Sequence, residues 1–151
     1  MRRKFSMPEF VAAQLEQIKE LRAELVGATD AYNESLLRAE AAFKALNLGV
    51  TAVVELEPNE SDRSGWSQLI RFGKHGHEWR LLLESGPEGG EEEEWSISPL
   101  VNASKEIRLL AANRLPDLLG ALMTRAREEV EEIRTQDSKI NELVTALQGG
   151  V

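Results

Sequence analysis

The stretch VAAQLEQIKELRAELVGATDAYNESLLRAEAAFKAL, residues 11–46, carries the strongest structural signal in the sequence. Its residues recur at alternating spacings of four and three, which is the heptad pattern of a coiled-coil seam. The seam positions are Val11, Leu15, Ile18, Arg22, Leu25, Thr29, Tyr32, Leu36, Ala39, Phe43 and Leu46. The spacing predicts one long helix over residues 9–48. Gly27 is its weakest point, because glycine lowers helix propensity.

Capping signals frame this predicted helix. Ser6 followed by Glu9 resembles a capping box, and Pro8 is tolerated in a first helical turn. Gly49 stands where a C-terminal glycine cap is expected.

Residues 50–98 change character and predict a four-stranded antiparallel meander. The four apolar runs are VTAVVELE, GWSQLIRFG, HEWRLLLES and EEWSISPL, and turn-type segments rich in Gly, Pro, Asn and Ser separate them. Alternation along each run assigns one set of side chains to the face that packs against helices. That set is Ala52, Val54, Leu56, Trp66, Ile70, Phe72, Trp79, Leu81, Leu83, Trp95 and Ile97.

Helical periodicity returns over residues 102–148. Asn102 or Ser104 caps the first helical segment, and Pro116 either starts a new helix or kinks a continuing one. The four-and-three spacing reappears at Leu119, Met123, Ala126, Val130, Ile133, Asp137, Ile140, Val144 and Leu147. The sequence thus predicts a single α+β domain over residues 1–151, consisting of a helical arm, a β-meander and C-terminal helices.

We expect the two seams to pair as an antiparallel coiled coil, because the sheet joins the end of one helix to the start of the other. With Leu46 beside Leu119, the polar residues Thr29 and Asp137 share one layer, and such a layer fixes register. Arg22 then lies opposite Val144 without a matching partner. The alternatives are a parallel pairing between two subunits and a first helix that is broken at Gly27.

Further apolar residues lie off the seams and predict a homodimer or a larger homo-oligomer. A two-helix arm does not cover both of its stripes, so a second copy forming a four-helix bundle is the economical arrangement. The expected oligomer interface consists of Leu21, Val26, Leu37 and Leu143.

Composition excludes several classes of protein. The formal net charge is -8 at pH 7, and the only basic run is at residues 2–4, so we expect no nucleic-acid partner. The chain has no cysteine, which removes disulfides, thiolate catalysis and Cys-type zinc sites. No apolar run follows the basic start and none approaches the ~20 residues that cross a bilayer, so we expect a cytoplasmic protein without a membrane partner.

Candidate ligand sites are weak. His75 and His77 form an His-x-His pair in a predicted hairpin, where two exposed imidazoles without a third ligand are the simpler interpretation. The run from Glu91 to Glu94 lacks the interleaved spacing of a calcium loop. No phosphate loop, HExxH or GxSxG motif is present, so we expect no metal, no cofactor and no catalytic residue.

The outer face of the predicted sheet is the best candidate for binding a protein. Pairing Phe72 with Trp79 places Leu69 beside Leu82 and Arg71 beside Arg80, with Val53 on the same face. Nearby glutamates neutralise the two arginines, or the apolar strip is a recognition patch for an acidic, apolar segment of a partner.

Three functions remain open from the sequence. The leading hypothesis is a homo-oligomeric adaptor, assembly or scaffold protein that binds a protein partner through its coiled arm and its sheet. The second is a chaperone or inhibitor that sequesters one partner on the sheet. The third is an enzyme whose site forms between subunits.

Overall fold

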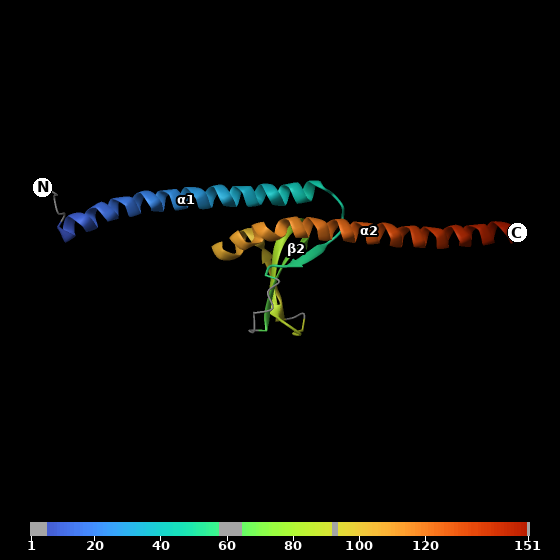
Figure 1. The fold of residues 1–151 in the computed structure, drawn as a ribbon. Coiled ribbons are helices and arrows are strands. Elements are labelled where there is room, and N and C mark those ends of the chain that lie inside the picture. Colours follow the sequence, from blue (N-terminus) through green and yellow to red (C-terminus); the bar gives the residue numbers. More distant parts are fainter. Residues whose placement is uncertain (1–5, 58–64, 92–93, 151) are drawn as a thin grey trace. The chain divides into compact units, whose positions relative to one another are not determined.

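The computed structural model describes residues 6–57, 65–91 and 94–150. Three parts of the sequence discussed above lie outside the described residues. They are the basic run at residues 2–4, residues 58–64 between the first two predicted strands, and Glu92 and Glu93. The chain divides into two compact units, Met1–Ala41 and Ala42–Val151, which are described one at a time. The elements have the predicted α+β composition, with two long helices and a four-stranded antiparallel sheet (Figure 1).

Helix α1 (Met7–Ala45) is continuous through Gly27, and Figure 1 shows an unbroken ribbon. At its start, Ser6 Oγ accepts a hydrogen bond from the Glu9 backbone N–H over 3.4 Å, which is half of the predicted capping box. The prediction of its C-terminal end was wrong. The helix stops at Ala45, and Asn47 rather than Gly49 is the first residue with left-handed backbone, at φ 50°. Asparagine tolerates this conformation because its short polar side chain bonds locally.

The sheet consists of β1 (Ala52–Glu55), β2 (Trp66–His75), β3 (Glu78–Pro87) and β4 (Ser96–Pro99). Every neighbouring pair is antiparallel and the strand order follows the chain, so the predicted meander is confirmed. A two-residue turn at Gly76 and His77 joins β2 to β3, with His75 paired to Glu78. Gly76 has φ 66°, a value that side-chain-bearing residues rarely adopt at the first position of such a turn.

The inner face of the sheet is the core of the second unit. Ala52 pairs with Phe72, Phe72 with Leu81, and Ile70 with Leu83, and all of these side chains are buried. The Phe72 ring stacks on Trp79 with centroids 5.6 Å apart and also contacts Phe43 at the same separation. Cross-strand apolar pairs of this kind are the main stabilising unit of a sheet.

The predicted orientation of β4 was wrong. Leu83 pairs with Ser98 and Glu84 pairs with Ile97, so the serines of β4 follow the inner face and Ile97 lies on the outer one. Trp95 also lies outside, because a Cβ built on Gly86 of β3 would overlap its ring. The reason is positional. β4 is an edge strand, where the core no longer selects for apolar residues, so its hydrophobic pattern does not reveal its register.

Helix α2 (Lys105–Gly149) follows a short 3-10 turn, η2 (Leu100–Asn102). Ser104 is the N-cap and accepts a hydrogen bond from the Ile107 backbone N–H over 3.4 Å. Pro116 lies inside the helix, so the second alternative, a continuing helix, is the observed one. None of the described helices contains a stretch apolar enough to cross a bilayer.

The first half of α2 covers the sheet. It contacts β1 and β2 and buries Ala111, Leu118 and Leu122. Arg114 Nε donates a hydrogen bond to the backbone oxygen of Glu55 over 2.7 Å, which ties the helix to the exposed edge of β1. From Met123 to Gly149 no residue of α2 is buried. We call residues 123–149 the distal segment, and Figure 1 shows that it runs past the sheet toward the C-terminus.

Adjacent leucines of α2 test this packing. Leu118 is 0% exposed and Leu119 is 40% exposed. We expect Leu118→Ala to lower the free energy of unfolding by about 2–5 kcal/mol, because it leaves a cavity against the sheet. Leu119→Ala, the matched control, should cost well under half as much in urea-induced unfolding followed by tryptophan fluorescence. Equal losses at the two positions would contradict the packing of α2 on the sheet.

Candidate functional site

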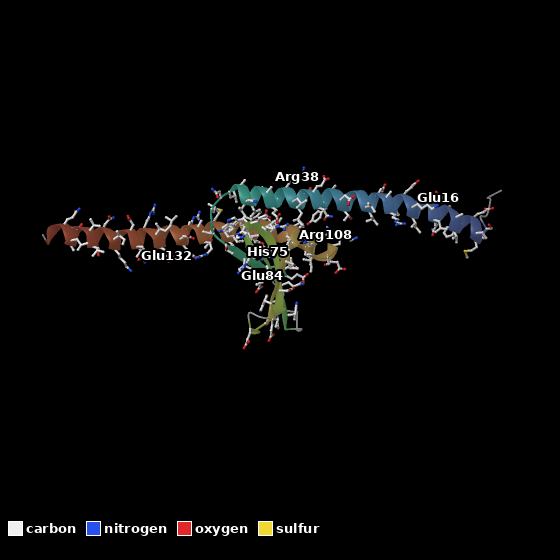
Figure 2. The ribbon with its side chains drawn as sticks, turned by 180° about the vertical axis from the view of Figure 1, so that it is seen from behind. Glu16, Arg38, His75, Glu84, Arg108 and Glu132 are labelled. Carbon is white, nitrogen blue, oxygen red and sulfur yellow. The ribbon has the colours of Figure 1, made fainter. Side chains whose placement is uncertain are left out.

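The distal segment of α2 presents an apolar stripe that its own unit does not cover. Figure 2 shows side chains projecting from this helix on all sides, around Glu132, with no other element of the same unit beside them. The exposed seam residues are Met123, Val130, Ile133, Ile140, Val144 and Leu147. Seam residues at this spacing fall on one face of a helix and form the contact stripe of a coiled coil.

Charged residues flank this stripe. Arg127 and Arg134 follow seam positions on one side, and Glu129 precedes one on the other. The ion pairs within the helix are exposed and weak, with Arg125 and Glu128 3.0 Å apart and Arg134 and Glu131 3.8 Å apart. Arg134 both borders the seam and takes part in one of these weak pairs, so it is able to exchange its local contact for one with a partner helix.

Residues 7–41 of α1, the part in the first unit, form a single helix with the same kind of stripe. Its exposed seam residues include Val11, Leu15, Ile18 and Leu25. The seam also contains Arg22, one turn after Ile18. Lys19 lies beside the stripe and forms an exposed ion pair with Glu16, with 3.1 Å between Nζ and Oε1.

The predicted polar layer of Thr29 and Asp137 stays a prediction, because the two residues lie in different units. Each is satisfied within its own helix. Thr29 Oγ1 donates a hydrogen bond to the Leu25 backbone oxygen over 2.7 Å, and Asp137 Oδ2 accepts one from Asn141 Nδ2 over 3.4 Å. The threonine hydroxyl has therefore already used its only proton.

The predicted oligomer-interface residues are all exposed. They are Leu21, Val26, Leu37 and Leu143. Three of them lie on α1 and one lies on α2, and their role in self-association stays a prediction.

The outer face of the sheet has a different register from the predicted one. Arg71 pairs with Leu82, Leu69 with Glu84, and Gly73 with Arg80, which is a shift of two residues along β3. The predicted neighbours Arg71 and Arg80 are therefore not opposite one another. The turn explains the difference, because the positive φ of Gly76 places the turn one residue later than the aromatic pairing implied.

An ion pair neutralises this face. Arg71 Nε lies 2.6 Å from Glu84 Oε1, and Glu84 is only 9% exposed. The sequence allowed two interpretations of this face. For Arg71 the structure supports neutralisation by a nearby glutamate. Figure 2 shows Glu84 on the sheet, below the hairpin end marked by His75.

The apolar part of the outer face is not a continuous open strip. Leu82 is 1% exposed and cannot meet a partner, whereas Val53 (42%) and Ile97 (45%) are exposed at opposite edges of the sheet. Sequence reasoning missed Ile97 and Trp95 as outer-face residues. The glycine at position 86 was the available signal, since a glycine inside a strand often marks a site where a ring approaches closely.

The histidines do not gather further ligands. His75 and His77 are exposed at the β2–β3 turn. Among residues 6–57, 65–91 and 94–150, no group of three or more His, Asp or Glu side chains is placed to hold a metal ion.

No protein-family model matches this chain, and neither a curated protein nor a solved structure is significantly similar to it. The geometry of the two units is therefore the whole basis for a functional proposal.

The Arg71–Glu84 pair gives a direct test of the outer face. We expect Arg71→Met to lower the free energy of unfolding by about 1–3 kcal/mol, because it leaves a largely buried carboxylate without its partner. Adding Glu84→Leu should recover most of the loss. The control is Arg125→Met in the exposed pair with Glu128, which should change stability by no more than about 0.5 kcal/mol. Denaturant titration would contradict the ion pair if Arg71→Met matched this control.

Proposed function

We propose that this chain is a non-enzymatic interaction protein that assembles with further copies of itself through the seams of α1 and α2. In this assembly the sheet is the folded base from which the distal segment of α2 extends. One observation carries the proposal. The distal segment continues the heptad spacing past the sheet, where its own unit offers nothing to cover it.

The energetics support a helical partner for this segment. Full burial of a Val, Leu or Ile side chain contributes about 1.5–3 kcal/mol. A long helix in water derives most of its stability from packing an apolar face, so a stripe kept in solvent would lose that contribution. A helix with a matching stripe covers it best, because seam residues then insert between those of the partner. The same chain carries such a stripe on α1.

A second candidate is sequestration of a partner on the sheet, as a chaperone or an inhibitor would do. The exposed side chains of Val53 and Ile97 favour it. The burial of Leu82 and the pairing of Arg71 with Glu84 count against it, because both remove contacts that a partner would need. The helices therefore have the stronger claim as the principal interaction surface.

Light scattering tests the proposed function. We expect a homo-oligomer at micromolar concentration, and Ile133→Glu should weaken self-association at least tenfold by placing a charge in the seam. Ser138→Glu adds the same charge on the polar face and is the matched control, with no expected effect. The sheet should stay folded in both variants by tryptophan fluorescence. A wild-type monomer of 16.8 kDa would contradict the proposal.

A further inference from the structure

Each helix carries one charged residue of opposite sign inside its seam. Arg22 lies between Ile18 and Leu25 of α1, and Asp137 lies between Ile133 and Ile140 of α2. A charge that enters an apolar interface costs free energy unless an opposite charge meets it. The two residues therefore restrict which pairings of the seams are acceptable.

When identical helices pair in parallel, neither seam charge meets an opposite charge. Two copies of α1 would place Arg22 against Arg22, and two copies of α2 would place Asp137 against Asp137. In a parallel coiled coil, equivalent seam positions face one another in the same layer, so both arrangements bring like charges together. Like charges in an interface act against that partner and select for a different one.

Parallel pairing of α1 with the distal segment of α2 brings the two charges into one layer. With Arg22 opposite Asp137, Thr29 lies opposite Val144, and the other neighbouring layers pair apolar residues. These layers are Leu15 with Val130, Ile18 with Ile133, and Leu25 with Ile140. Each of these six residues is a seam position of its own helix, so in this register the seam positions of α1 face seam positions of α2.

The flanking charges support the same register. Glu129 precedes the seam position of Val130, and Lys19 follows that of Ile18. In a parallel pair these are the two flanking positions that approach across the interface, and their charges are opposite. A shift by one heptad separates Arg22 from Asp137. It sets Arg22 against Val130 or Val144, and Asp137 against Thr29 or Leu15.

This pairing needs two chains. In the same register Phe43 would lie beyond the C-terminal end of α2, about 54 Å along the axis from Leu122. Within one chain, however, both residues border the same sheet, because Phe43 contacts Phe72 and Leu122 is buried by α2 packing on β1 and β2. The longest strands have 10 residues, or about 33 Å. A single chain therefore cannot bring the two stripes into this register.

We propose that α1 of one chain pairs in parallel with the distal segment of α2 of a second copy, with Arg22 and Asp137 in one layer. This inference rests on the proposed function and specifies its interface. It uses the same seam as the antiparallel pairing predicted from the sequence, so the two compete. The antiparallel pairing leaves Arg22 against Val144, whereas the parallel pairing satisfies both charges.

Charge reversal tests the layer. Arg22→Asp alone and Asp137→Arg alone should each weaken self-association at least tenfold in analytical ultracentrifugation. An equimolar mixture of the two variants should assemble again, because each junction between them joins one Asp to one Arg. The double variant Arg22→Asp/Asp137→Arg should also assemble by itself. The controls are Glu24→Arg and Lys139→Asp, which reverse charges outside the seam and should leave assembly unchanged.

Other results would overturn the pairing in distinguishable ways. A wild-type monomer would remove the proposed function together with this inference. An oligomer that both single variants leave intact would remove only the inference. An effect of Asp137→Arg without any effect of Arg22→Asp would indicate pairing of identical α2 helices. Failure of the mixture to assemble, with both variants folded by circular dichroism, would exclude a junction between chains.

Disulfide trapping tests the direction of the helices, since the native chain has no cysteine. Mixed Ile18→Cys and Ile133→Cys proteins should form a covalent dimer containing one chain of each, and Ile18→Cys alone should not. The matched comparison is Ile18→Cys with Leu147→Cys in one chain, which the antiparallel pairing brings together. A cross-link within that double variant, and none in the mixture, would overturn the parallel pairing.

Discussion

The packing of Leu118 and Leu122 of α2 against the sheet determines which part of α2 belongs to the core of the second unit and which part extends beyond it. These two side chains are almost fully buried, and with Ala111 they form the helical side of the core. Because α2 is long, the contact uses only its first half. The same rigid element that closes the core therefore carries the distal segment, and the seam of that segment faces solvent as a direct consequence of where the core ends.

The sheet is organised by its central hairpin. Gly76 sets a two-residue turn between β2 and β3, and this turn fixes which residues oppose one another over the length of both strands. The register brings Arg71 within reach of Glu84 and buries Leu82 between its neighbours. A face that the hydrophobic pattern alone marks as a binding strip is thereby largely satisfied within the chain. The exposed apolar side chains of this face, Val53 and Ile97, lie on the two edge strands.

The helical seams have the opposite character. Their apolar residues form regular stripes, but each stripe is interrupted by one charge, Arg22 in α1 and Asp137 in α2. A charge in a coiled-coil seam lowers stability and raises selectivity, because it penalises every pairing that leaves it unmatched. The division of opposite charges between two different helices is the basis of the proposed contact between unlike helices of separate chains.

The sequence by itself determined the elements of this protein. Heptad spacing located α1 and the distal half of α2, Ser6 marked the start of α1, and Gly-rich turns separated four strands in a meander. For the start of α2 the sequence offered Asn102 or Ser104, and the structure selects Ser104. These features depend on neighbours in the chain, which a sequence displays directly. Only the tertiary structure decided the register of β2 with β3, the outward side of Trp95 and Ile97, and the continuation of α2 through Pro116. Those depend on a turn conformation and on where the core stops, and period-two alternation gives the same pattern for registers that differ by two residues.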